Sequence, residues 1–63
     1  MTYRVEQFQL LKKYNDELRT RLLHTYSYEV QNHYDELILQ NMDRMDLLWK
    51  TMTPEERKEL ENL

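Results

Sequence analysis

The chain has 63 residues, no cysteine and no glycine, and its formal net charge is −3. Such a chain forms one small domain with a marginal core, because the fraction of surface that folding buries falls as chains shorten. Without cysteine, disulfides and thiolate chemistry are excluded, and without glycine the tight turns of β-hairpins and phosphate loops are disfavoured. Self-association is then the main way to complete the core.

Opposite charges are concentrated in the two halves of the chain. Residues 1–24 carry five basic and three acidic side chains, whereas residues 25–63 carry four basic and nine acidic ones. Such halves attract each other weakly when they pair antiparallel, within one chain or between two. No apolar run approaches the roughly 18–20 residues of a membrane-spanning helix. We therefore expect a cytoplasmic protein that does not contact membranes.

Two long helices are predicted first. One covers about residues 3–24, with Thr2 as its N-cap. The following residues, about 25–28, carry hydroxyl, aromatic and β-branched side chains that are weak helix formers, which predicts a turn. Ser27 can cap the second helix, over about residues 28–51.

A short third helix is predicted over about residues 54–62. Thr53 is its N-cap, Pro54 fits the first turn, and Glu56 stands where a capping box needs its carboxylate. Because Leu60 and Leu63 are its only large apolar residues, we expect this helix to be held weakly.

One apolar stripe runs through both long helices. Its members recur every three or four residues, which is the spacing of one helix face, and they are nearly symmetric about Tyr28. Two helices that reverse direction near Tyr28 would bring symmetric partners level. The stripe supplies the predicted self-association core: Phe8, Leu11, Leu18, Leu22, Tyr26, Val30, Tyr34, Ile38, Met45 and Leu48.

The same stripe permits two architectures. Its mean spacing of about 3.67 residues matches an eleven-residue repeat, which one long helix in an antiparallel coiled-coil dimer would satisfy. In contrast, five consecutive four-residue steps from Leu18 to Ile38 place a phase slip at the centre. We therefore predict an all-α fold, with an antiparallel helical hairpin and a short C-terminal helix, that dimerises into a four-helix bundle. The single long helix is the alternative.

Two asparagines interrupt the stripe. A buried asparagine lowers stability but fixes the register and the number of partners. We predict that Asn15 and Asn41 face each other as a register-setting polar pair. The alternative is that each lies at the wet edge of the bundle.

The polar residues give little support to catalysis or ligand binding. One face of the second predicted helix carries carboxylates and an imidazole one turn apart, a spacing that can bind zinc. This set lies off the apolar stripe and is better interpreted as a solvated face; it comprises Glu29, His33, Glu36, Gln40 and Asp43. The basic residues of the first helix scatter around it, whereas a nucleic-acid site would gather them. We predict no enzyme activity, cofactor, metal or nucleic-acid contact.

The aromatic and methionine residues exceed what so small a core can bury. Tyrosine, tryptophan and methionine are enriched at protein interfaces. The candidate partner interface comprises Tyr3, Tyr14, Met42 and Trp49. We therefore expect a non-enzymatic protein–protein interaction module, an inhibitor, adaptor or regulator, that acts as a homodimer on one other protein. Its small size and acidic, glycine-free composition are compatible with a phage-encoded protein. The alternatives are a structural self-assembly unit and a nucleic-acid-associated regulator.

Overall fold

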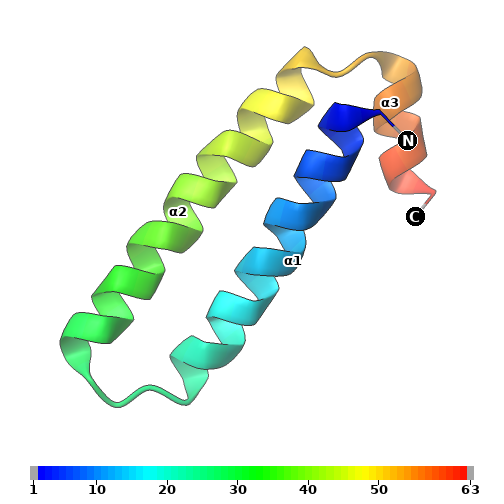
Figure 1. The fold of residues 1–63 in the computed structure, drawn as a ribbon. Coiled ribbons are helices and arrows are strands. Elements are labelled where there is room, and N and C mark those ends of the chain that lie inside the picture. The colour runs from blue at the N-terminus through cyan, green and yellow to red at the C-terminus, as the bar shows by residue number, and fades with distance from the viewer. Residues whose placement is uncertain (1, 63) are drawn as a thin grey trace.

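A computed structural model describes residues 2–62, which form three helices and no strand. Helix α1 spans Tyr3–Leu23, α2 spans Tyr28–Thr51 and α3 spans Pro54–Glu61. The two long helices lie antiparallel and side by side, and α3 folds back at the end away from the turn (Figure 1). The predicted helical hairpin is therefore confirmed. The alternative of one long helix through Tyr28 is wrong, because the chain leaves the helix after Leu23.

The turn between α1 and α2 contains no glycine and is stabilised by hydrogen bonds of polar side chains. The Thr25 hydroxyl donates a 2.6 Å hydrogen bond to the carbonyl of Arg21, at the end of α1. The Gln31 side-chain amide donates to the Thr25 carbonyl, also at 2.6 Å, and the Ser27 hydroxyl accepts from the Val30 amide at the start of α2. No described residue has a positive φ angle. The reversal is thus built without a positive φ angle and is stabilised by three polar side chains.

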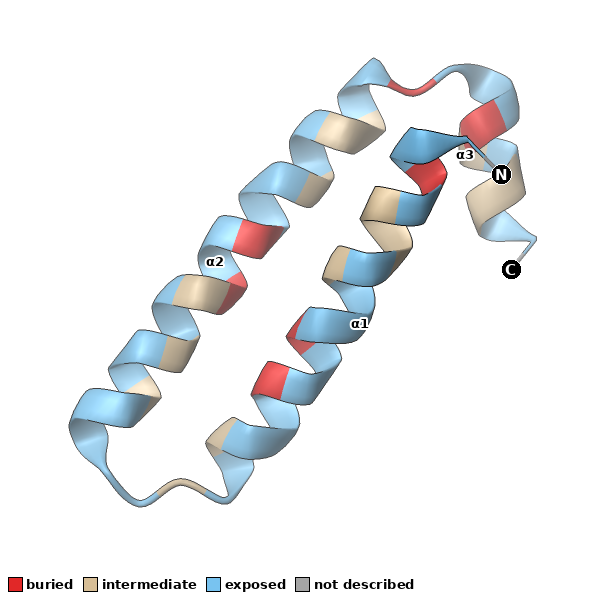
Figure 2. Ribbon diagram, in the orientation of Figure 1, coloured by how far each residue is buried: buried red, intermediate tan, exposed pale blue. Residues whose placement is uncertain are grey.

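The buried residues lie in two places, where α1 and α2 face each other and around the attachment of α3, as the red segments of Figure 2 show. Leu18 is 1% exposed and Ile38 is 8% exposed. Other members of the stripe are half-buried around them: Phe8, Leu11, Leu22, Tyr34, Met45 and Leu48. The apolar stripe therefore forms the contact between the long helices over most of its length.

Two members of the predicted core lie outside the contact between the helices. Tyr26 is 98% exposed, and Val30 is 38% exposed. The physical reason is that Tyr26 lies in the turn, where helical periodicity no longer sets the direction of a side chain, and Val30 lies in the first turn of α2. Tyr26 therefore takes no part in the core of a single copy, and its place in the self-association core stays a prediction.

Helix α3 has contacts with the rest of the chain beyond those of its few apolar residues. It packs against α1, where Val5 is fully buried although it lies off the stripe. Met52, just before α3, is 5% exposed, and Glu56 is 7% exposed. Of the two leucines expected to hold this helix, Leu60 is half-buried and Leu63 lies outside the described residues. A buried carboxylate therefore adds an attachment that the count of leucines did not include, and how firmly the helix is held stays a prediction.

Candidate interaction surfaces

The two asparagines of the stripe meet in the middle of the hairpin. Asn41 Nδ2 donates a 2.9 Å hydrogen bond to Asn15 Oδ1, and Asn15 Nδ2 lies 3.5 Å from the Ile38 carbonyl oxygen. The two residues are 3% and 6% exposed. Burying an amide without a hydrogen bond is unfavourable, so sliding one helix along the other would leave both side chains unpaired in apolar surroundings. The contact suits a register-setting pair, a role that stays a prediction.

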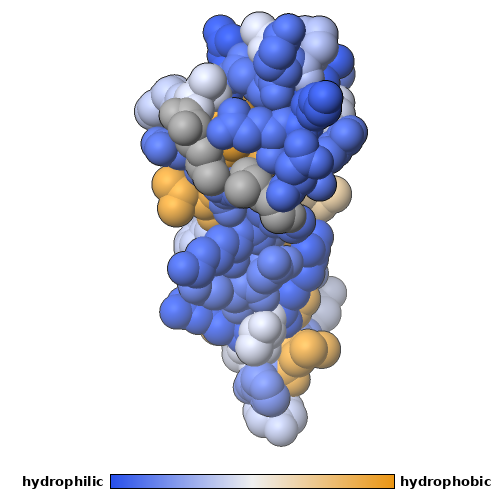
Figure 3. All heavy atoms as spheres, turned by 90° about the vertical axis from the view of Figure 1, so that its right-hand side faces the viewer, coloured by the Kyte–Doolittle hydropathy of each residue, from blue (hydrophilic) through white to orange (hydrophobic). Residues whose placement is uncertain are grey.

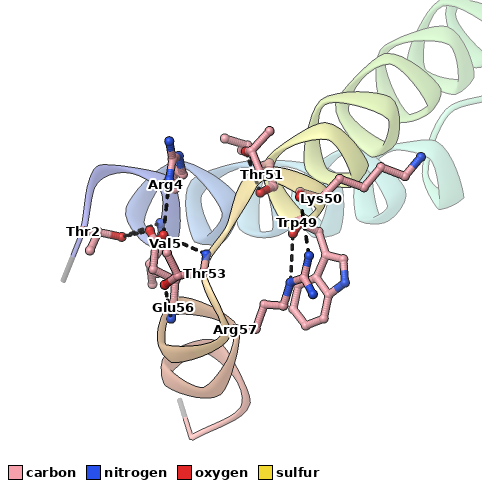
Figure 4. Close-up of polar contacts among 10 residues, drawn as sticks. Thr2, Arg4, Val5, Trp49, Lys50, Thr51, Thr53, Glu56 and Arg57 are labelled. Atoms are coloured by element: carbon pink, nitrogen blue, oxygen red, sulfur yellow. Dashed lines mark hydrogen bonds and ion pairs between the residues drawn. The ribbon is translucent and has the colours of Figure 1, made fainter.

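A buried carboxylate joins the N-terminal ends of α1 and α3. Figure 4 shows Glu56 between Thr2, Arg4 and Thr53. Its carboxylate accepts hydrogen bonds from the Thr2 hydroxyl at 2.5 Å, the Thr53 amide at 3.1 Å and the Arg4 guanidinium at 3.3 Å. The Glu56 amide in turn donates to the Thr53 hydroxyl, which completes a capping box. The same side chain therefore begins α3 and attaches it to α1.

These hydrogen bonds make the attachment of α3 dependent on pH. The Thr2 hydroxyl, then the Thr53 amide and the Arg4 guanidinium, hold the pKa of Glu56 below its ordinary value of 4.5 against the opposing effect of burial. The ionised carboxylate therefore stabilises the folded chain. This stabilisation is fully present above the ordinary pKa and is lost as the pH falls through the lower folded pKa.

We therefore expect acid to destabilise the natural protein more than a Glu56→Gln variant. Thermal melting from pH 7 to pH 3 measures the difference, since the other carboxyl groups are common to both proteins. The additional loss for the natural protein should begin below about pH 4.5, because only its Glu56 can take up a proton. Equal losses for the two proteins would contradict this assignment.

Trp49 lies half-buried between α1 and α3. Its ring centre is 6.2 Å from that of Phe8, and the guanidinium carbon of Arg57 lies 5.3 Å from it, within the range of a cation–π contact. Arg57 Nε also donates a 3.0 Å hydrogen bond to the Trp49 carbonyl, near the end of α2 (Figure 4). A cation at this position is favoured by the helix dipole. Trp49 thus contributes to the packing of α3 while part of its side chain stays accessible for a partner.

The candidate partner interface is divided between two grooves. Tyr3 lines one groove, whereas Met42 and Trp49 line another, and the two share no residue. The first is lined by Tyr3, Gln7, Leu11, Arg44, Leu47, Leu48 and Thr51. The second is lined by Phe8, Met42, Met45, Asp46 and Trp49.

The division follows from helix geometry. Tyr14 and Met42 are symmetric about Tyr28 in the sequence. Tyr14 precedes Asn15 by one residue and Met42 follows Asn41 by one, so they are rotated by about 100° in opposite senses. When two right-handed helices pack antiparallel, a residue one position before the contact on one helix and a residue one position after it on the other point to opposite faces of the hairpin. Residues that flank the stripe symmetrically therefore separate, although residues within it meet.

In a single copy of the chain, the predicted solvated face of α2 is exposed, which holds for Glu29, His33, Glu36, Gln40 and Asp43. Within residues 2–62, no group of three or more histidine, aspartate and glutamate side chains is placed to hold a metal ion. None of the described helices combines the length and apolarity that crossing a membrane requires.

The sequence did not predict the contacts that connect α1, α2 and α3. Thr2 and Glu56 were each identified as capping residues, but their mutual hydrogen bond joins positions 54 residues apart. An arginine three residues after a capping proline was the one available signal for the contact between Arg57 and the end of α2. Comparisons with protein-family models, with curated proteins and with solved structures found no significant match to this chain.

Proposed function

We propose that this chain is a non-enzymatic protein–protein interaction module that works as a homodimer. The supporting observation is the imbalance between buried and exposed apolar side chains. Among residues 2–62, the buried apolar side chains are Val5, Leu18, Ile38 and Met52. Exposed large apolar side chains are more numerous: Tyr3, Leu10, Tyr14, Leu23, Tyr26, Tyr28, Val30, Leu39, Met42 and Leu47.

The accessible surface also favours a dimer. The chain exposes 5054 Å² at a mass of 8.0 kDa. A compact monomer of this mass exposes about 4,450 Å², roughly 600 Å² less. A protein interface of ordinary size covers about 800 Å² on each partner. One such interface would therefore cover more than the surplus surface of each copy.

We expect light scattering to give twice the chain mass of 8.0 kDa at concentrations of tens of micromolar. The reason is that a core with four buried apolar side chains among residues 2–62 leaves an isolated hairpin marginally stable. Dilution should lower both the mass and the melting temperature, because association stabilises the folded chain by mass action. A stable monomer, with a melting temperature independent of concentration, would overturn the proposed dimer.

The turn tip, defined as Leu23, Tyr26 and Tyr28, is the proposed contact for a second protein. These side chains are 82%, 98% and 76% exposed. The hydrogen bonds of Thr25 and Gln31 stiffen the backbone that carries them, which lowers the entropy lost on binding. Tyrosine is a frequent hot-spot residue. An apolar pocket on a protein partner is the surface that would accept this tip.

A variant of the turn tip distinguishes an interaction module from the alternative, a structural self-assembly unit. Leu23, Tyr26 and Tyr28 are replaced together by serine, and the variant and natural protein are cross-linked in extracts of the source cell. A partner retained by the natural protein and lost by the variant, while both remain dimers, supports the interaction module. Identical products that contain only this chain would favour self-assembly alone.

The nucleic-acid-associated regulator is a less favoured alternative. Arg4, Arg19 and Lys50 each lie within 3.5 Å of a carboxylate oxygen of the same chain. These pairs lower the positive potential available to phosphates. Oligonucleotide binding with a steep dependence on salt concentration would favour this alternative.

A further inference from the structure

We infer that a second copy of this chain packs against the open face of the hairpin, with α1 of each copy beside α2 of the other. The open face is defined as the side that carries Tyr3, Leu10 and Tyr14 on α1 and Arg44 and Leu47 on α2. This inference rests on the proposed homodimer, and it adds which face is used and which residues meet.

The open face combines a groove with exposed apolar side chains. Tyr3, Arg44 and Leu47 border the groove, which has a volume of about 350 Å³. Tyr3 and Leu47 are 73% and 63% exposed. Leu10 and Tyr14 follow Tyr3 by seven and eleven residues, which is the spacing of one helix face, and are 60% and 43% exposed. Side chains of a facing helix can fill such a groove, as they do between the layers of a four-helix bundle.

Helix α3 leaves the open face clear. Its Leu60 borders a different groove, together with Phe8, Gln9, Lys12, Lys13 and Asp16 of α1. The side of the molecule that carries α3 is mainly hydrophilic, with hydrophobic groups toward its margins (Figure 3). A partner that covers apolar surface would therefore gain less on the α3 side than on the open face.

The contact between Asn15 and Asn41 fixes which residues are level. Asn15 lies beside Asn41, and their residue numbers sum to 56. A residue of α1 and a residue of α2 are therefore at the same height along the hairpin when their numbers sum to about 56. A twofold axis parallel to the helices keeps this level between copies, because it moves nothing along the helices. Leu10 then lies beside Leu47 of the partner copy, and Arg21 lies beside Glu36 of the partner copy.

The distribution of charge favours a twofold axis parallel to the helices over a twofold axis perpendicular to them. Helix α1 carries five basic and three acidic residues, whereas α2 carries two basic and five acidic ones. The parallel axis places α1 against α2 of the partner copy, so opposite charges meet. The perpendicular axis would place α1 on α1 and α2 on α2, where like charges repel each other.

Arg21 and Glu36 allow a sharp test. Both are exposed helix residues, so their replacement should leave the hairpin folded, which circular dichroism verifies. Arg21→Glu or Glu36→Arg places like charges together twice in each dimer. We expect each single variant to weaken dimerisation roughly tenfold at low salt, and the double variant to restore the dissociation constant to within about twofold. Single variants without effect, or a double variant weaker than both, would overturn the pairing.

A matched pair of substitutions tests the face itself. Leu47→Glu introduces a charge on the open face, and Met42→Glu introduces the same charge in the groove beside Trp49. Analytical ultracentrifugation should find Leu47→Glu largely monomeric and Met42→Glu dimeric, with both variants helical. The reverse pattern would place the dimer contact at the Met42 groove and overturn this inference while leaving the proposed homodimer intact. A monomeric natural protein would instead overturn the proposed homodimer.

Discussion

Replacing Leu18 with alanine should lower the free energy of unfolding by about 3 kcal/mol. Leu18 is 1% exposed, between α1 and α2, so the substitution removes apolar contacts and leaves a cavity that the two helices close only in part. A domain of this size has a total stability of roughly 3–9 kcal/mol. We therefore expect the substitution to remove between about a third and all of that stability.

Urea denaturation followed by circular dichroism measures this loss, at equal protein concentrations because dimerisation adds to stability. Leu39→Ala is the matched control. Leu39 lies on α2 and is 61% exposed, so its loss should change stability by less than about 0.5 kcal/mol. Equal losses for the two variants would mean that the contact between α1 and α2 does not form the core.

Replacing Asn41 alone with leucine should destabilise the protein more than replacing Asn15 and Asn41 together. The single substitution leaves Asn15 Oδ1 buried without the donor that now lies 2.9 Å from it. An unsatisfied buried acceptor costs about 1–3 kcal/mol. The double variant has no unpaired amide and buries two additional apolar side chains, so its stability should exceed that of the natural protein.

The same double variant tests the register-setting role of the pair. Without the asparagines, no buried polar contact fixes the register of α1 against α2 or the number of copies that associate. Light scattering should therefore detect a mixture of oligomers. Urea denaturation of the natural protein, both single variants and the double variant gives the coupling energy. A less stable double variant with one unchanged oligomeric state would show that the pair does not set the register.

Local chemistry made much of the fold predictable. The hydroxyls of Thr2, Ser27 and Thr53 each cap the helix that their position indicated. The symmetric stripe predicted the contact of Asn15 with Asn41. Both residues lie on the helix faces that pack together, so they meet when the chain reverses direction near Tyr28. These features depend on the near neighbours of each residue and on helical periodicity, and both can be read from a sequence.

Features that depend on the path of the chain in space were not predictable. Val5 lies off the stripe and is buried because α3 returns to α1. Glu56 fulfils its predicted cap, yet its contacts with Thr2 and Arg4 require the ends of the chain to meet. Residues that flank the stripe symmetrically lie on opposite faces of the hairpin because both helices are right-handed and antiparallel, and symmetry of the sequence alone does not express this; the candidate partner interface stays a prediction.

The all-negative φ angles of the described backbone have a practical consequence for mutagenesis. No position from 2 to 62 has the positive φ angle that favours glycine, so alanine can replace each residue without the penalty of a left-handed backbone. A complete alanine scan of this segment would therefore measure side-chain contacts and helix propensity, without a contribution from backbone strain. The chain is consequently well suited to experiments that apportion binding energy residue by residue.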